Sequence, residues 1–336
     1  MPAALAALPS FSLVPPPVEW LALIGAAGNA VAHLCFKRAM GAGAPRVLLA
    51  ARWGTGAVAM TGALLVGNGW GAFHPSWSLL LLALGSISGP VVGWLLYLRA
   101  LPHLDVSVAQ PIFNSSVVVS MVLAVLLLGE RPNAFTWLGA LLILVGVQLL
   151  QRSGSRHRRH GSPTVAGGAV APGPKVAPWA VGWLTRWINP YLLPALASAG
   201  CLGIASFCFK VGLGELSPVE TNWVRTTVPS LVLCGLILAG ELPPRAGSGG
   251  LRPLLTWQGL ALAVAAGIAN DVVGWGARLV ALKHGPLTVV EPLASTSPLF
   301  AALLGAWILG ERLDPWGWAG IVATLLGGAL LGGLGR

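Results

Sequence analysis

The chain carries one set of motifs twice, in the same order. The pairs are Cys35-Phe36-Lys37 with Cys208-Phe209-Lys210, Arg52 with Arg225, Val91-Val92-Gly93-Trp94 with Val272-Val273-Gly274-Trp275, Gln110-Pro111 with Glu291-Pro292, and Gly129-Glu130-Arg131 with Gly310-Glu311-Arg312. One change of spacing, in a loop that is longer in the second half, aligns all of them. Such colinear repetition restricts the fold to two copies of one structural unit.

The composition places both copies in a membrane. The chain is 55% hydrophobic and 9% charged, whereas soluble domains carry roughly 25% charged residues. Crossing about 30 Å of hydrocarbon takes about 20 apolar helical residues, and ten stretches are candidates: 19–38, 47–67, 77–98, 106–128, 134–150, 191–211, 219–240, 257–280, 287–309 and 316–334. Five spans per half is an odd number, so the halves must face opposite ways. We predict an all-α integral membrane protein with ten transmembrane helices in two inverted five-helix repeats.

The segment between the two halves has a different composition. Residues 151–190 begin with a run of Arg and His and continue through Gly, Pro and Ala, a composition that buries too little apolar surface to fold by itself. We therefore predict three parts: repeat one at 1–150, a flexible basic linker at 151–190, and repeat two at 191–336.

The repeated motifs resemble the drug/metabolite transporter superfamily, and within it the ten-span EamA-type transporters. The shared features in each half are a Lys in the first helix, an Arg in the second, and Gly-Glu-Arg followed by Trp-x-Gly after the fourth. The resemblance implies alternating access around a central cavity between the two halves, which we expect to be formed largely by helices 1, 3, 4, 6, 8 and 9. It also implies an exporter or exchanger of a small polar metabolite or drug, in the plasma (inner) membrane, with cytoplasmic termini. The distribution of charge indicates the opposite orientation, because most of the 20 Lys and Arg residues lie on the linker side of the ten spans.

Four cations repeat within or beside the predicted spans: Lys37, Arg52, Lys210 and Arg225. Each would cost about 2.5–3.5 kcal/mol at the centre of a membrane helix. All four lie near helix ends, which predicts side chains that extend to the interface and anchor the helices on backbone carbonyls. The alternative is direct contact with an anionic group of the solute. Other candidates for solute binding or gating are Trp94, Trp275, Gln110 and Asn114, near Pro111 and Pro292, which interrupt helices at matching places.

Two carboxylates, Asp271 and Glu291, lie inside predicted spans where the first half has Pro90 and Gln110. An ionisable group at membrane depth is a functional candidate by default, so one of them is predicted to exchange a proton, with Asp271 preferred. The alternative is a structural ion pair with Arg278 or Lys283. Glu130 and its counterpart Glu311 are instead predicted to cap the helix that follows each of them.

Other kinds of function find little support in the sequence. No metal-ligand cluster, phosphate loop or catalytic arrangement is present, and no cofactor is expected; the four cysteines lie in apolar stretches without a Cys-x-x-Cys pair. The net charge of +10 suits anionic lipid and the setting of topology better than nucleic acid. The expected partners are the lipid bilayer, a small solute and a proton, with the oligomeric state open. A channel, or a multispan scaffold or receptor, remains the alternative, and solute flux in liposomes would separate a transporter from a scaffold.

Overall fold

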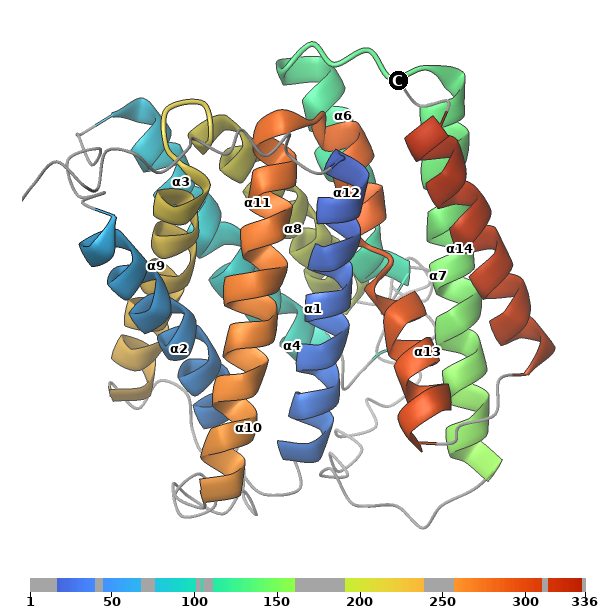
Figure 1. Ribbon diagram of the computed structural model, residues 1–336, viewed down its shortest axis with the longest axis horizontal. Coiled ribbons are helices and arrows are strands. Elements are labelled where there is room, and N and C mark those ends of the chain that lie inside the picture. Colours follow the sequence, from blue (N-terminus) through green and yellow to red (C-terminus); the bar gives the residue numbers. More distant parts are fainter. Residues whose placement is uncertain are drawn as a thin grey trace, which may run out of the picture.

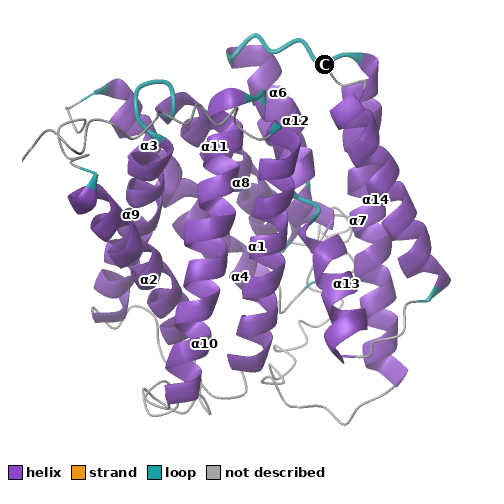
Figure 2. Ribbon diagram, in the orientation of Figure 1, coloured by secondary structure: helices purple, strands orange, loops and turns teal. Residues whose placement is uncertain are grey.

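A computed structural model of the protein describes residues 17–39, 45–67, 76–100, 104, 111–160, 191–238, 257–309 and 314–333. These residues form helices joined by turns and contain no strand (Figures 1 and 2). In the first half the helices are α1 (Val18–Ala39), α2 (Pro45–Val66), α3 (Trp77–Ile87), η2 (Ser88–Gly93), α4 (Trp94–Ala100), α6 (Ser116–Leu127) and α7 (Ala134–His160). In the second half they are α8 (Leu192–Gly212), α9 (Pro218–Leu238), α10 (Trp257–Gly267), η4 (Ile268–Gly274), α11 (Trp275–His284), α12 (Leu287–Ala294), α13 (Ser297–Leu309) and α14 (Pro315–Gly333).

Each predicted span corresponds to one helix or to one run of consecutive helices. The third span is α3, η2 and α4, the eighth is α10, η4 and α11, and the ninth is α12 and α13. One boundary differs clearly: α7 continues to His160, although the fifth span was expected to end at residue 150. The residues after 150 contain no proline before position 163, and a helix can carry charged side chains freely once it has left the hydrocarbon. The first ten residues of the predicted linker are therefore helical, and residues 161–190 lie outside the described part.

The surface of the helical bundle is suited to lipid. Seven helices or helix runs are long and apolar enough to cross a membrane, and a shorter apolar helix covers Pro111–Leu127. Large apolar side chains point outward from many helices, among them Val58, Leu126, Trp257 and Trp307, which are 74%, 72%, 80% and 84% exposed. The interior combines apolar side chains such as Leu82 and Phe209 with buried polar and charged ones such as Thr221 and Asp271. This distribution confirms an all-α, multi-pass membrane protein.

The last spans of the two halves, α7 and α14, lie side by side (Figure 1). A Cβ atom added at Gly139 would lie 2.9 Å from the carbonyl oxygen of Gly327, and one at Gly146 would lie 2.7 Å from that of Gly320. The start of α7 therefore contacts the end of α14, so the two helices run antiparallel. Gly139 and Gly320 are counterparts in the two repeats, as are Gly146 and Gly327, and this crossing agrees with an inverted repeat.

The third span of each half contains a π-helical segment, η2 or η4, at a matching position. The first span of the opposite half packs against it. The Ser198 hydroxyl of α8 donates a 2.7 Å hydrogen bond to the Gly93 carbonyl, and a Cβ added at Gly25 of α1 would lie 3.0 Å from the Gly274 carbonyl. Such wide turns inside α-helices occur frequently at functional sites.

The fourth and ninth spans also break at matching places. A turn follows Pro111 at Ser115, and one follows Pro292 at Ser295. The hydroxyl of Ser115 donates a 2.6 Å bond to the Ile112 carbonyl, and that of Ser295 donates a 2.7 Å bond to the Pro292 carbonyl. A proline cannot complete the helical ladder, and the neighbouring hydroxyl groups satisfy carbonyls at the break.

Candidate functional site

A buried charge cluster lies at η4 in the middle of the eighth span. The Asp271 side chain is completely buried, and its carboxylate pairs with two arginines. Arg52 of α2 donates from Nε to Oδ2 at 2.9 Å, and Arg225 of α9 donates from Nη2 to Oδ1 at 2.9 Å. Asn270 also donates to Oδ1 at 2.9 Å. We call these four residues together with Asn222 the Asp271 cluster.

Asn222 fixes the geometry of this cluster. Its side-chain oxygen accepts a 2.9 Å bond from Arg225 Nε, and its amide nitrogen donates a 2.7 Å bond to the Asp271 backbone carbonyl. Asn222 lies one helical turn before Arg225 on α9, so both side chains face η4. Two arginines and one aspartate leave the cluster with a net charge of +1.

The position of these arginines corrects the expectation from the sequence. Arg225 is only 2% exposed and Arg52 11%, so neither extends to the membrane interface as predicted. The two repeated cations of the second half, Lys210 and Arg225, also have different partners, because Lys210 lies in the last turn of α8 and binds backbone carbonyls of the α11–α12 turn. The arginines are tolerated in this buried position because Asp271, on the adjacent segment η4, supplies the countercharge that burial requires.

A second ion pair lies two turns further along the same run of helices. Arg278 of α11 donates from Nη2 to both oxygens of Glu291, at 2.6 and 2.5 Å. This matches the structural alternative for Glu291, whereas Asp271 pairs with neither Arg278 nor Lys283. The Trp275 ring joins the two charged groups, since the guanidinium carbons of Arg225 and Arg278 lie 4.3 and 4.2 Å from its centroid.

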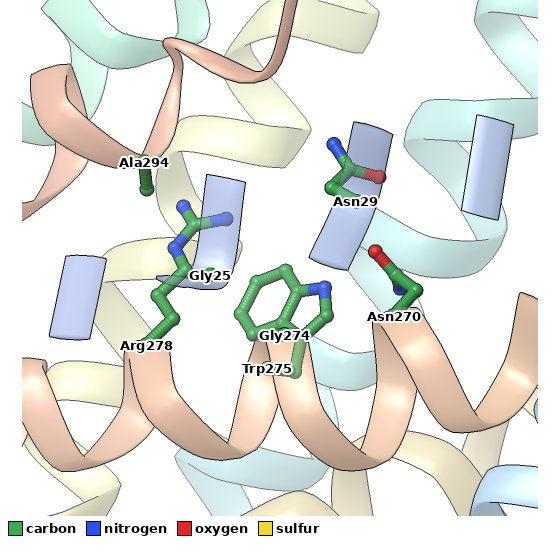
Figure 3. Close-up of a pocket in the computed structure, with 7 residues that line it drawn as sticks. All are labelled: Gly25, Asn29, Asn270, Gly274, Trp275, Arg278 and Ala294. Atoms are coloured by element: carbon green, nitrogen blue, oxygen red, sulfur yellow. The ribbon is translucent and has the colours of Figure 1, made fainter. Parts of the chain in front are cut away.

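A small pocket opens beside this ring (Figure 3). Its walls come from α1, η4, α11 and the end of α12. In Figure 3 the indole of Trp275 lies between the guanidinium group of Arg278 and the amides of Asn29 and Asn270. The lining residues are Gly25, Asn29, Asn270, Gly274, Trp275, Arg278 and Ala294. The pocket thus offers an aromatic surface flanked by one cation and two amides, built from spans 1, 8 and 9 of the six spans expected to form the cavity.

The matching region of the first half is chemically different. Trp94 packs edge-on against Tyr97 and Phe113, with ring centroids 6.1 and 5.8 Å apart. Tyr97 and Phe113 are the repeat counterparts of Arg278 and Ala294. Trp94 is therefore a packing residue, whereas Trp275 lines a pocket. Asn114, on the turn after Pro111, has a buried amide nitrogen without a hydrogen-bond partner.

The junction between α11 and α12 gathers two more of the sequence candidates. Lys210 donates to the carbonyls of Leu282 and Gly285, the latter at 2.7 Å, which agrees with its predicted role as an anchor on backbone carbonyls. Glu130 accepts bonds from the backbone N–H groups of Leu287 and Thr288 at 2.7 and 2.9 Å.

Glu130 therefore caps α12 of the opposite half, and the prediction that it caps the following helix, α7, is wrong. A carboxylate at the end of one span can reach the positive end of any helix that begins beside it. Among the remaining candidates, the Lys37 side chain, Gln110 and Glu311 lie outside the described residues.

Sequence reasoning missed the amides of Asn29, Asn222 and Asn270. An amide inside an apolar span is costly unless it is hydrogen-bonded, and that cost was the available signal. Asn270 directly precedes Asp271, and Asn222 lies three residues before Arg225. Both amides could have been found by searching for polar neighbours of the buried charges. Asn29, whose amide nitrogen donates to Ser297 Oγ at 3.2 Å, has no charged neighbour along the chain.

Comparison with known proteins agrees with this architecture. The profile of the "EamA-like transporter family" matches the chain twice, over residues 17–151 and 189–333. The chain belongs to the EamA-like transporter family. It is thus a multi-pass membrane transporter, with one family unit in each half, and the resemblance seen in the repeated motifs is confirmed.

Several characterised or named proteins are similar to parts of this EamA chain. An "Uncharacterized transporter in cobO 3'region" from Sinorhizobium sp is 32% identical over 144 residues, which cover 41% of this chain and 92% of that protein. The "Probable magnesium transporter NIPA6" of Arabidopsis thaliana is 33% identical over 99 residues, 29% of this chain and 28% of that protein. The "Probable 4-amino-4-deoxy-L-arabinose-phosphoundecaprenol flippase subunit ArnE" of Pectobacterium atrosepticum is 38% identical over 60 residues, 18% of this chain and 53% of that protein.

The fold also has a counterpart among solved structures. One, described as "Crystal structure of protein", superposes with a TM-score of 0.68 and 19% identity, covering 95% of this chain and 96% of that one. The likeness extends over nearly the whole length of both chains, and at this identity it concerns the fold alone.

Proposed function

We propose that this EamA protein is an alternating-access exporter or exchanger of a small polar metabolite, bound in the pocket between α1, η4, α11 and α12. The single observation that carries the proposal is the position of this pocket. It adjoins a π-helical interruption in a membrane span, next to the buried charges of Asp271 and Glu291, whose counterparts in the first half are Pro90 and Gln110. Transporters commonly bind their solute at such interruptions, near the interface between inverted repeats.

The chemistry of the pocket supports a polar organic solute. Asn29 and Asn270 offer amide donors and acceptors, Arg278 offers a cation, and Trp275 offers a flat apolar surface. Magnesium is a second candidate, because some relatives are named as magnesium transporters. It is the less favoured one, because Mg²⁺ takes oxygen ligands, and both carboxylates of the site are already engaged by guanidinium groups.

The test is solute flux into proteoliposomes that contain the purified protein. A panel of labelled metabolites and Mg²⁺ would be supplied outside, with and without the same compound inside. We expect a polar metabolite to enter, and unlabelled compound on the opposite side to accelerate its entry, because a carrier exchanges solutes and a channel does not. No flux of any compound would favour a scaffold or receptor.

The variant Trp275→Ala tests whether this pocket is the binding site. It removes the aromatic wall and should lower the apparent affinity for the transported solute at least tenfold. Trp257→Ala, at a position 80% exposed on the outer surface, serves as the matched control and should transport normally. Equal transport by both variants would place the binding site elsewhere.

A further inference from the structure

We propose, resting on the function proposed above, that Arg278 binds the carboxylate group of an anionic solute and that Glu291 is the internal counter-ion displaced by that solute. On displacement Glu291 takes up a proton, so one proton and one organic anion cross the membrane together.

Arg278 stands between the pocket and Glu291. Its side chain lines the pocket and is 18% exposed, whereas Glu291 is 4% exposed and is absent from the lining. In Figure 3 the guanidinium group points from α11 toward Gly25 and Ala294, beside the open space. A solute in the pocket can therefore reach Arg278 without first contacting Glu291.

The hydrogen bonds of Arg278 are incomplete. Guanidinium Nε and Nη2 commonly bind a carboxylate together, one nitrogen to each oxygen. Here both oxygens of Glu291 accept hydrogen bonds from Nη2. The Nε atom is buried and has no hydrogen-bond partner. A buried donor left unpaired costs about 1–3 kcal/mol. A carboxylate entering from the pocket could use this donor, which makes Arg278 a site prepared for a second anion.

Charge balance requires the proton. Once a solute carboxylate occupies Arg278, the Glu291 carboxylate would remain buried without its counter-ion, and burial strongly disfavours such a charge. Protonation removes the charge and lets Glu291 become a neutral donor. The pair gains one anion and one proton, so its net charge does not change during loading.

Other ionisable groups do not replace Arg278 as the partner of Glu291. Of the helices packed on α12, α6 has no ionisable side chain, and α7 has none from Ala134 to Gln151. On α11 the others are Lys283, which donates to the Leu216 carbonyl at 3.0 Å, and His284. On α1 they are Glu19, His33, Cys35, Lys37 and Arg38. The guanidinium group of Arg225 lies over the Trp275 ring and forms an ion pair with Asp271.

Asp271 is the poorer proton carrier of the two carboxylates. It holds two guanidinium groups and an amide, so protonating it would leave two buried cations without a countercharge. Glu291 holds a single arginine, which the solute itself can neutralise. The sequence favoured a proton-linked antiporter with Asp271 as the proton carrier. The structure instead favours Glu291, and it favours symport of anion and proton, because the solute and Glu291 compete for one arginine.

The test compares solutes of one size that differ in charge. Lactate, lactamide and alanine form an anionic, neutral and zwitterionic series, and 3-phenyllactate, 3-phenyllactamide and phenylalanine form a larger one. Binding to purified protein and uptake into proteoliposomes would be measured from pH 5.5 to pH 8, where the acids stay ionised. We expect the acid to be preferred in at least one series. Its apparent Kd should rise by up to about tenfold per pH unit, the limit for one linked proton.

Two results would overturn the proposal. One is that no acid is preferred in either series. The other is that acid uptake ignores an imposed pH gradient or responds to a membrane potential set with potassium and valinomycin. If neutral or zwitterionic solutes are transported well and the acids are not preferred, the proposed transport function is retained and only the anion-binding role of Arg278 is rejected. If no compound in the wider metabolite panel is transported, the proposed function itself fails.

Variants connect the effect to the residues. Glu291→Gln should bind the acid without pH dependence, whereas Glu215→Gln, at an exposed turn, should behave as wild type. Should Glu291→Gln fail to fold because Arg278 is left unpaired, the double variant Arg278→Tyr with Glu291→Gln introduces the residue types of the counterpart positions in the first half, Tyr97 and Gln110. It should fold and lose its preference for the acid. Retained pH dependence of acid binding in folded Glu291→Gln, or retained preference for the acid in the folded double variant, contradicts the proposal.

Discussion

Asp271 holds together side chains from three membrane spans. Its carboxylate pairs with Arg52, 219 residues away in the first repeat, and with Arg225, 46 residues away in the second, while its backbone carbonyl accepts a hydrogen bond from the Asn222 amide. A buried ion pair contributes little compared with an apolar replacement, but removing one partner is strongly destabilising. The residue is therefore structurally demanding even before any role in transport.

The variant Asp271→Asn should lower the free energy of unfolding by about 3–5 kcal/mol, because it leaves two buried guanidinium groups without a counter-ion. The measurement is a reversible unfolding titration with denaturing detergent. Glu215→Gln removes a carboxylate from an exposed turn and is expected to change stability by less than about 0.5 kcal/mol. A loss below 1 kcal/mol for Asp271→Asn would show that the arginines find other partners.

Helix elements in this fold depend on close backbone approach. The α7–α14 pair crosses at glycines that have no room for a side chain, because carbonyl oxygens of the opposite helix occupy the place of each Cβ. In a membrane such contacts replace the hydrophobic effect as the source of helix association.

We expect Gly146→Ala to destabilise the protein by about 1–3 kcal/mol, the usual cost of forcing an extra group into a packed core. Its added Cβ would lie 2.7 Å from the Gly320 carbonyl oxygen. The matched control is Gly235→Ala on α9, where nothing lies within 4 Å of the added atom. The same unfolding titration measures both, and equal stability of the two variants would mean that α7 and α14 do not cross as closely as described.

The turn between α11 and α12 is held from two other spans. Lys210 binds carbonyls at the end of α11, and Glu130 binds the first N–H groups of α12 and the Thr288 hydroxyl, the last at 2.7 Å. Both ends of the turn are thereby capped by charges of the favourable sign.

Removing the cap with Glu130→Gln should loosen the start of α12. Loss of an N-cap costs about 1 kcal/mol, so hydrogen exchange at the Leu287 and Thr288 amides should accelerate about fivefold. Glu220→Gln provides the control, because Glu220 accepts a 2.7 Å bond from Ser217 N at the start of α9 and caps that helix rather than α12. Unchanged exchange in Glu130→Gln would indicate that the carboxylate is dispensable for α12.

At the scale of the whole molecule, the two halves share a fold and differ in chemistry. Both have a π-helical segment in the third span and a break in the fourth. The first half fills the region around Trp94 with aromatic rings, whereas the second surrounds Trp275 with arginines and a pocket. The region around Trp94 thus provides mainly packing, whereas the region around Trp275, completed by Gly25 and Asn29 of the first half, provides the candidate site.

The ten-span arrangement predicts that the end of α7 and the end of α14 lie on opposite sides of the membrane, because the two helices run antiparallel. Single cysteines at positions 160 and 336, in a protein without its four natural cysteines, should react with an impermeant thiol reagent from opposite faces of intact vesicles. Reaction of both from one face would contradict the arrangement. The face that labels position 336 also decides between cytoplasmic termini and a cytoplasmic linker.

The sequence by itself determined the number of spans, their approximate bounds, the two repeats and their opposite directions. These properties depend on hydropathy and motifs that are local along the chain, and a span must be apolar wherever its neighbours lie. The charged residues of the candidate site were also visible, because a charge within an apolar stretch is conspicuous.

Only the tertiary structure decided which of those charges meet. Arg225 and Lys210 lie in similar apolar surroundings along the chain, yet one is buried against Asp271 and the other caps α11. Glu130 likewise reaches α12 rather than the helix that follows it. Which charges pair depends on where along their length the spans cross, and the glycines and π-helical segments set these crossings. The crossings bring together residues whose separation in the sequence does not indicate their distance in space.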